Sequence, residues 1–359
     1  QNKCNGCMAC FSVCPKNCIT FKDTISEINA EIDESICIKC KLCERVCPNI
    51  SNVKKTKPIV WKQGWSLSNI RKTSTSGGIA SEIIKNFIRN GGYVASCLFK
   101  DGEFVFDITN DLEIAKKFAG SKYVKSNPDG IFKKVKKTLS MAPVLFIGLP
   151  CQVAGLKNYI KNDENLYTID LICHGTPSAK LLDMYLKERN YDLSQLDDIK
   201  FRNKNDYGLM INNKKLELPH VMDHYLCSFI EAVRFTDNCY NCNYASIERI
   251  SDITLGDSWG TEYEAEAKKG ISLILCQTQK GLDLLEESNI ELKDVDINKA
   301  IENNHQLSQP SNLKRAKSRF FYHIKKNKNF ILSTDICLPK MIIKQKIKYI
   351  LIRLHILKI

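Results

Sequence analysis

The sequence lacks several features that would assign a function class at once. Its 359 residues contain no run of about 18 uninterrupted apolar residues, so no transmembrane helix is expected. The segment that follows Gln1 is polar and cysteine-rich rather than basic and then apolar, which argues against a secretory signal peptide. Neither G-x-G-x-x-G nor a Walker A sequence occurs, so neither a Rossmann nucleotide site nor a P-loop is predicted. We therefore expect a cytoplasmic protein.

Acidic residues are in the minority. Lys and Arg number 53 against 40 Asp and Glu, a formal net charge of +13. Such an excess suits nucleic acid, an anionic membrane or acidic partners. A basic–aromatic recognition motif is missing, so we expect no nucleic-acid partner.

Basic residues are concentrated at the C-terminus. Residues 336–359 contain no Asp or Glu, and their basic residues are Lys340, Lys344, Lys346, Lys348, Arg353 and Lys358. Together with Ile and Leu, they suit a helix lying in the plane of a membrane surface. The tail therefore predicts peripheral membrane contact. Docking of this helix on the protein body or on a partner is the alternative.

Cysteine is abundant, with 17 residues in the chain. Nine of them lie within residues 4–47, and eight of these form two tight runs in which neighbouring thiols are too close in sequence to form sensible disulfides. A chain of this size without an export signal also does not suggest a disulfide framework. Metal ligation is the better interpretation.

Eight of the nine N-terminal cysteines form a repeated pattern that resembles bacterial two-cluster ferredoxins. C-x-x-C-x-x-C-x-x-x-C-P ends at Cys14-Pro15 and recurs in full, ending at Cys47-Pro48. In this arrangement the fourth cysteine of each run ligates the other [4Fe–4S] cluster. The predicted ligand sets are Cys4, Cys7, Cys10 and Cys47 for one cluster, and Cys37, Cys40, Cys43 and Cys14 for the second.

The alternative for this segment is a pair of structural zinc sites. Zinc prefers paired C-x-x-C knuckles, which two triplets each followed by C-P fit poorly. Residues 19–33 between the runs are expected to form a β-hairpin. Cys18 lies outside the pattern and is interpreted as a packed thiol.

Beyond a polar linker at 51–60, apolar runs alternate with amphipathic stretches. Residues 79–90 have helical spacing and end at Gly91-Gly92. The sequences YVASCLF and EFVFDIT predict a strand and its hairpin partner. Further strands are expected at 143–148, 167–173, 250–256 and 271–278. Helical segments between several of them predict an α/β body with a mixed sheet, followed by a basic helical tail.

Four body cysteines lie at unusual places. Cys151 follows a predicted strand, Cys173 ends another, and Cys239 and Cys242 form a C-x-x-C. Strand ends are where an open α/β sheet places its chemistry, so four such thiols suit a third [4Fe–4S] cluster. The alternative treats the first two as buried small hydrophobes and the C-x-x-C as half a zinc knuckle or a redox pair. His174, next to Cys173, is either a proton carrier or structural.

The segment KTSTSGGIASEII, residues 72–84, is the best candidate for anion binding. Hydroxyl groups and glycines precede a helix N-terminus, whose N–H groups and dipole favour a phosphate. A plain helix cap would need only one of these residues. The additional hydroxyl groups and glycines favour a site for the phosphate of a cofactor.

Five motifs taken together resemble the beta-subunit family of coenzyme F420 hydrogenases and dehydrogenases. They are TSTSGG, GLPCQVAGL, DLICHGTPS, RFTDNCYNC and ITLGDSWG, in that order. The resemblance implies FAD and [4Fe–4S] clusters. By motif, Ser76, Gly77 and Gly78 would contact the flavin, and Cys151, Cys173, Cys239 and Cys242 would ligate a third cluster.

These observations predict an α+β protein: a bacterial-ferredoxin-like domain followed by a mixed-sheet α/β flavin-binding body. The expected divisions are 1–55 for the ferredoxin-type domain, 61–140 and 141–305 for two parts of the body, and 306–359 for the tail. The expected function is an iron–sulfur flavoprotein oxidoreductase, with no catalytic residue assigned. Its partners would be ferredoxin or a redox partner subunit, and a small-molecule substrate or a deazaflavin or nicotinamide coenzyme. The alternative is a non-catalytic iron–sulfur electron-transfer subunit.

Overall fold

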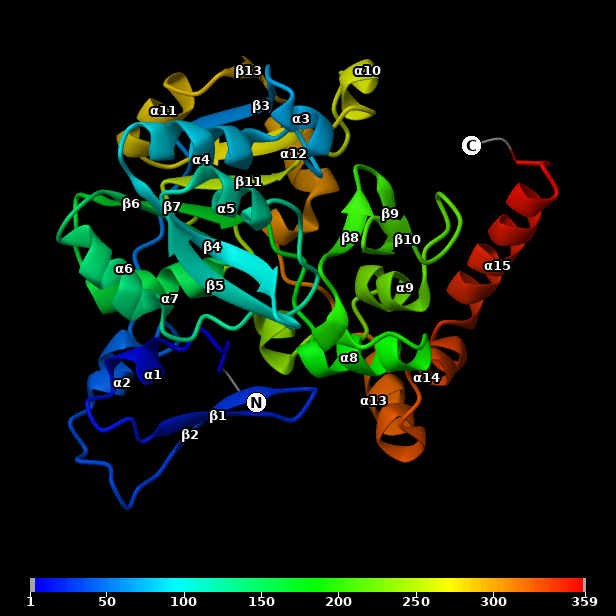
Figure 1. The fold of residues 1–359 in the computed structure, drawn as a ribbon, viewed down its shortest axis with the longest axis horizontal. Coiled ribbons are helices and arrows are strands. Elements are labelled where there is room, and N and C mark those ends of the chain that lie inside the picture. The colour runs from blue at the N-terminus through cyan, green and yellow to red at the C-terminus, as the bar shows by residue number, and fades with distance from the viewer. Residues whose placement is uncertain (1–3, 358–359) are drawn as a thin grey trace.

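The computed structural model describes residues 4–357 (Figure 1). The N-terminal module contains α1 (Ala9–Val13), β1 (Ile19–Asp23), β2 (Ile28–Ile32) and α2 (Leu42–Val46). β1 and β2 pair antiparallel, with Ile19 opposite Ile32. The hairpin predicted between the two cysteine runs is thus present, and each run contains one of the two short helices at the same place.

The body is built on an eight-stranded sheet with the order β13-β3-β12-β11-β7-β6-β4-β5. Its strands are β3 (Val60–Ser66), β4 (Tyr93–Lys100), β5 (Glu103–Thr109), β6 (Val144–Gly148), β7 (Leu166–Leu171), β11 (Ile253–Asp257), β12 (Ser272–Cys276) and β13 (Ile290–Lys293). The neighbouring strands β11, β7, β6 and β4 are parallel, and the other pairings are antiparallel. The predicted mixed sheet is confirmed, including the β4–β5 hairpin.

Helices cover both faces of this sheet. The helices of the body are α3 (Ile70–Thr73), α4 (Ile79–Arg89), α5 (Leu112–Ala115), α6 (Ile131–Leu139), α7 (Pro150–Ile160), α10 (Glu264–Ala267), α11 (Gln279–Glu286) and α12 (Ile297–Asn303). α4 and α11 pack their apolar residues on one face, around Ile83 and Leu284. α6 and α7 cover the other face, around Phe132 and Val153, and Cys7 and Ala9 of the N-terminal module join this second core.

A second lobe packs beside the sheet (Figure 1). It contains β8 (Ile199–Asn203), β9 (Asp206–Ile211), β10 (Lys214–Lys215), α8 (Ala179–Glu188), α9 (His224–Ile230), α13 (Arg315–Asn327), α14 (Phe330–Cys337) and α15 (Pro339–Arg353). Its core gathers aromatic side chains such as Tyr185, Phe201 and Phe330. The tail is helical as predicted, whereas the sequence patterns do not identify the small sheet of β8, β9 and β10.

No helix within residues 4–357 is both long and apolar enough to cross a membrane.

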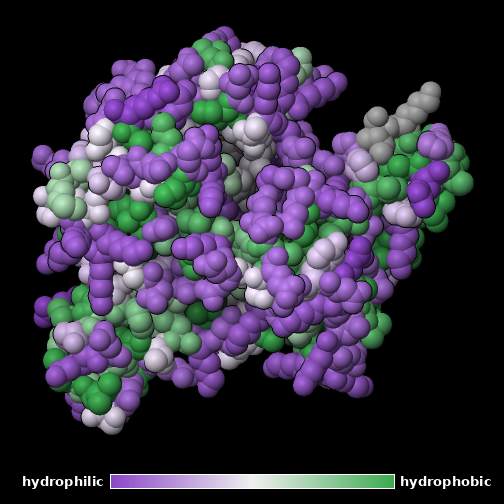
Figure 2. All heavy atoms as spheres, viewed as in Figure 1, coloured by the Kyte–Doolittle hydropathy of each residue, from purple (hydrophilic) through white to green (hydrophobic). Residues whose placement is uncertain are grey.

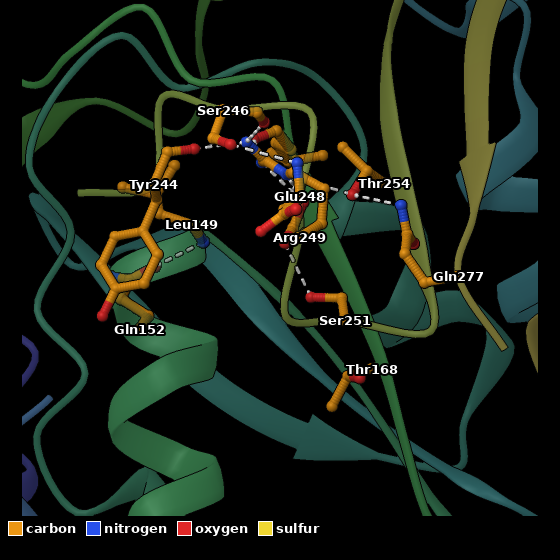
Figure 3. A network of polar contacts seen from close by, with 12 residues as sticks. Leu149, Gln152, Thr168, Tyr244, Ser246, Glu248, Arg249, Ser251, Thr254 and Gln277 are labelled. Atoms are coloured by element: carbon orange, nitrogen blue, oxygen red, sulfur yellow. Dashed lines mark hydrogen bonds and ion pairs between the residues drawn. The ribbon is translucent and has the colours of Figure 1, made fainter. Parts of the chain in front are cut away.

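A buried ion pair ties the strands to the loop that carries the last two body cysteines. Arg249 Nη2 lies 2.7 Å from Asp170 Oδ1 at the end of β7, and both side chains are shielded from solvent. Arg249 Nη1 also donates to Tyr244 O at 2.6 Å, and Ser251 Oγ donates to Asp170 Oδ2 at 2.9 Å (Figure 3). Thr56 of the linker joins the same loop, because its N–H donates to Arg249 O. This network fixes residues 244–251 against the sheet.

We predict that Arg249→Met destabilises the protein strongly, because it leaves the Asp170 carboxylate buried without a cation. Breaking a buried pair in this way costs about 3–5 kcal/mol. Denaturant titration of the metal-free chain measures the loss of unfolding free energy. The control is Lys62→Met, which removes the exposed pair with Asp294 and should cost at most about 1 kcal/mol. Equal losses in the two variants would contradict this account.

Candidate functional site

The two cysteine runs of the N-terminal module fold alike. Met8 and Lys41 precede α1 and α2 in the left-handed region, with φ of 60° and 59°. Cys14 and Cys47 end these helices in extended conformation, with φ of −69° and −70°. The sequence repeat is therefore also a structural repeat, and each fourth cysteine leaves its helix just before a proline.

One group of thiols combines the first triplet with the end of the second run. Burial raises the pKa of Cys10 to about 12, with further increases from the nearby thiols of Cys4 and Cys47. Burial likewise raises the pKa of Cys7, whose N–H donates to Asn5 Oδ1 at 3.2 Å. This grouping has the composition that the crossover predicts for the first cluster.

The second group contains Cys14, which packs with Cys37 and Cys43. Cys18 belongs to it as well, because its Sγ lies 3.4 Å from Cys14 Sγ. The contact with Cys14, followed by burial and the thiol of Cys37, raises the pKa of Cys18 to about 12. Sequence spacing does not indicate that Cys18 would lie among the predicted ligands. Cys40, in the same run as Cys37 and Cys43, is exposed.

The four body cysteines also come together. Cys151 is in the first turn of α7, directly after β6, and Cys173 follows the neighbouring strand β7. Cys239 and Cys242 lie at the 3-10 helix Asp237–Asn241. Burial raises the pKa of Cys151 to about 12 against an opposing effect of Lys125, and the thiols of Cys242 and Cys239 raise it further. Burial likewise raises the pKa of Cys173, and the other three thiols of this group raise it further.

These thiols are not arranged for a single ion. Within residues 4–357, no three His, Cys, Asp or Glu side chains are grouped closely enough to hold one metal ion. Structural zinc would need four such ligands around one centre. Each group contains the four thiols of one predicted ligand set, the number that a [4Fe–4S] cluster needs, and the second group contains Cys18 as a fifth thiol.

The first thiol group lies directly against the body group. Cys7 packs on α7 so closely that a Cβ at Gly155 would lie 2.9 Å from Cys7 Sγ. Cys151 is among the groups that act on Cys7, and Tyr244 lies near both of them as well as Cys47. Because Cys10 of the first group packs against the second group and lies near Cys43, the three groups follow one another from exposed Cys40 to Cys173.

A cavity of about 470 Å³ opens beside Cys173. Cys173 and Gln152 contribute to its wall, as do Ser76, Gly78 and the first turn of α4. Tyr123 forms part of the wall and stacks on Phe229 with ring centroids 4.4 Å apart. The cavity thus joins the body cysteines to the segment predicted to bind an anion.

Ser76 and Gly78 line this cavity, but Gly77 has a different environment. Gly78 adopts φ of 84° as the N-cap of α4, which suits glycine. The Gly77 N–H donates to Ser272 Oγ at 3.1 Å, and a Cβ at Gly77 would lie 2.4 Å from Gly64 O. Gly77 therefore allows the loop to approach the sheet, and its N–H is already used by the protein.

Two features of the cavity fit a bound anionic cofactor. Ile79, Ala80 and Ser81 line it at the N-terminus of α4, where backbone N–H groups have no carbonyl partner within the helix. Arg202, which is 4% exposed, also lines it. The two terminal nitrogens of Arg202 bind Asp257 at 2.8 and 3.0 Å, while its Nε is buried without a partner among the described residues. No sequence pattern points to Arg202.

His174 does not suit proton transfer. Its Nε2 lies 3.3 Å from Ile230 O, and its Nδ1 contacts the Gln306 amide nitrogen. Burial lowers the pKa of His174 to about 4, so the ring is neutral at pH 7. The structural interpretation is favoured.

Comparisons with known proteins agree with the two-part organisation. Residues 141–298 match the family model for the C-terminal part of the beta subunit in coenzyme F420 hydrogenase/dehydrogenase, and residues 3–50 match the 4Fe-4S dicluster domain. A chain of the F420-reducing [NiFe] hydrogenase complex from Methanosarcina barkeri shares the fold, with a TM-score of 0.52 and 19% identity, over 75% of this chain and 95% of that one.

Two curated relatives come from Methanocaldococcus jannaschii. The coenzyme F420-dependent sulfite reductase is 24% identical over 316 residues, which are 81% of this chain and 46% of that protein. An uncharacterized protein is 26% identical over 200 residues, 46% of this chain and 55% of that protein. The chain spans about half the length of the curated relatives it matches.

We predict that Cys14→Ser damages the cluster of the second triplet, because Cys14 packs together with Cys37 and Cys43 of that triplet. Electron paramagnetic resonance of the reduced, anaerobically reconstituted protein should show the same lost signal as Cys40→Ser. Cys227→Ser, a buried thiol in the second lobe, should retain every signal. A spectrum that instead matches Cys7→Ser would refute the crossover.

Proposed function

Because the chain belongs to the coenzyme F420 hydrogenase/dehydrogenase beta-subunit family and carries a 4Fe–4S dicluster domain, we propose that it is an iron–sulfur flavoprotein oxidoreductase. One observation carries this proposal: three groups of thiols follow one another from the surface to a cavity that the N-terminus of a helix also lines. The first two groups would hold the clusters of the ferredoxin-type module. Cys151, Cys173, Cys239 and Cys242 would hold a third.

The cavity is proposed to bind FAD. The N–H groups of Ile79, Ala80 and Ser81 would receive a phosphate, since they are unused within the helix and lie at its positive end. Arg202 Nε would donate to an acceptor of the cofactor. A flavin supplies the exchange between one-electron transfer and two-electron hydride chemistry that iron–sulfur clusters lack.

The cavity wall also contains aromatic side chains that suit a planar organic substrate. Tyr123 stacks with Phe229 and with Tyr207, whose rings are tilted by only 18° and 13° from its own. A deazaflavin, a nicotinamide coenzyme or a smaller ring compound would have such a surface against which to stack. Cys173 lines the same cavity, so a cluster of the third thiol group would lie close to a substrate bound there.

Electrons would enter or leave at the second triplet, where Cys40 is exposed. Ile36 and Ile38 beside it are 50% and 56% exposed, and Lys39 and Lys41 are exposed as well. A redox partner, either ferredoxin or a partner subunit, would fit this exposed apolar surface. The non-catalytic electron-transfer subunit is the second candidate, because the three thiol groups alone would suffice for it.

Flavin binding distinguishes the two candidates, and Ser81→Asp tests where the phosphate lies. A carboxylate in the first turn suits the helix dipole, so α4 should persist. Its charge beside a phosphate costs about 1–4 kcal/mol at 4 Å, so FAD should bind roughly tenfold to a thousandfold more weakly. Fluorescence titration of the cluster-loaded protein with FAD measures the change.

The matched control is Ser81→Asn, which is equal in size to the Asp variant but neutral and should bind FAD nearly as well as the unchanged protein. Equal binding by the Asp variant would refute the phosphate position. No flavin binding by the unchanged protein would refute the oxidoreductase and leave the electron-transfer subunit.

The C-terminal helix is proposed to lie on an anionic membrane surface. α15 projects from the second lobe, and apolar side chains gather on it (Figures 1 and 2). Ile343, Ile347, Ile350 and Leu354 share one stripe and are each more than half exposed. Lys340, Lys344, Lys346 and Arg353 are exposed on the same helix, which suits lipid phosphates rather than a neutral bilayer.

We predict that the unchanged protein floats with vesicles of phosphatidylglycerol but not with phosphatidylcholine vesicles. The double variant Ile347→Asp and Ile350→Asp should lose this binding, because two carboxylates would enter the lipid interface. Met141→Asp places a carboxylate on an exposed apolar residue outside the tail and should bind normally. Flotation that survives the double variant, or never occurs, removes the membrane contact. If the unchanged protein does not float but forms a dimer that the double variant loses, the apolar stripe of α15 contacts a second copy of the chain instead of a membrane.

A further inference from the structure

A buried lysine lies between the first thiol group and the body thiol group. Lys125 belongs to the loop that joins the 3-10 helix Lys116–Phe118 to α6 and is 7% exposed. Its ammonium donates to the carbonyl oxygen of Asn5, the residue after Cys4. A Cβ at Gly6 would lie 3.2 Å from the Lys125 Cε, so the lysine is packed against the loop of the first cysteine run.

Hydrogen bonds hold the loop of Lys125 to the two segments that contain Cys173 and Cys151. The Lys125 N–H donates to Pro177 O at 2.8 Å, in the segment that follows Cys173. The neighbouring Ser126 Oγ accepts from the Gln152 amide at 2.9 Å, next to Cys151. The backbone therefore holds the ammonium at a defined place among the predicted ligands.

Lys125 has no carboxylate partner. Among residues 4–357, no ion pair joins it to Asp or Glu. Its electrostatic partners are four thiols, in the order Cys151, Cys239, Cys173 and Cys4. Burial of a cation is unfavourable unless negative charge compensates it. Clusters held by thiolates at these positions would supply that negative charge on both sides.

We propose that Lys125 is an electrostatic positioning residue that raises the reduction potentials of the two clusters on either side of it and so favours electron passage between them. This inference rests on the proposed function. A cluster gains one negative charge with each electron it accepts, and a fixed cation nearby stabilises the reduced form more than the oxidised form. In the buried surroundings of Lys125 this effect is weakly screened by solvent.

The order of the partner thiols makes the expected effect unequal. Three of the four belong to the body group and one to the first group. The second group, with Cys14, Cys37, Cys40 and Cys43, contributes none of these four. Loss of the charge should therefore lower the potential of the body cluster most and that of the first cluster less, and leave the second cluster unchanged.

The experiment is a redox titration of the full, anaerobically reconstituted chain, followed by electron paramagnetic resonance, with Lys125→Met. We expect the midpoint potential of the body cluster to become more negative by the largest amount, that of the first cluster by less, and that of the second cluster to stay unchanged. The iron and sulfide content should not change. Lys125→Arg keeps the charge and should keep the potentials close to those of the unchanged protein. The control Lys157→Met removes another lysine, on α7, that donates to Ile250 O, and should shift none of them.

Three cluster signals with unaltered potentials in Lys125→Met would overturn the inference and leave the proposed function intact. Equal shifts in the Met and Arg variants would also overturn it, because packing rather than charge would then set the potentials. If Lys125→Met cannot assemble its clusters at all, assembly of all three clusters in Lys125→Arg supports a requirement for the positive charge. Failure of both variants to assemble them overturns the inference. An unchanged protein with only the two ferredoxin-type signals would overturn the inference together with the proposed third cluster.

Discussion

The ion pair between Asp170 and Arg249 is the contact on which the site depends. Asp170 lies at the end of β7, three residues before Cys173, and Arg249 lies seven residues after Cys242. Because neither side chain reaches water, the pair is stable only in the geometry that satisfies both, which includes the carbonyls of Tyr244 and Leu171. It thereby fixes the loop with the C-x-x-C next to the strand that leads to Cys173. The linker that follows the N-terminal module is hydrogen-bonded to the same loop, through the backbones of Thr56 and Arg249.

Close packing then brings the module to the body. Cys7 lies against Gly155 of α7, where any larger residue would push the two apart. Lys125 spans the same junction, from the segments that carry Cys151 and Cys173 to the backbone of Asn5. Short distances between the proposed clusters would require such contacts. The arrangement accounts for a buried cation that would otherwise be costly.

Much of this arrangement could be predicted from the sequence, for local reasons. The spacing of Cys4, Cys7, Cys10 and Cys14 constrains thiols through a few covalent bonds, and strands such as 144–148 are continuous apolar runs that only a buried sheet accommodates. What could not be predicted depends on distant contacts. The local pattern at Gly77 indicates an anion-binding glycine, yet its N–H donates to the Oγ of Ser272, which is 195 residues away in the sequence. Arg202, Lys125 and Arg249 act through partners that no local pattern identifies, and the position of Cys18 depends on how the two cysteine runs cross.

The central claim is that three groups of four thiols and one cavity form a continuous redox unit. Quantification of iron, acid-labile sulfide and flavin in the anaerobically purified full chain tests it most directly. The account predicts about twelve iron atoms and as many sulfides per chain, about four for each cluster, together with one flavin after incubation with FAD. About eight iron atoms without flavin, or zinc in place of iron, would contradict it.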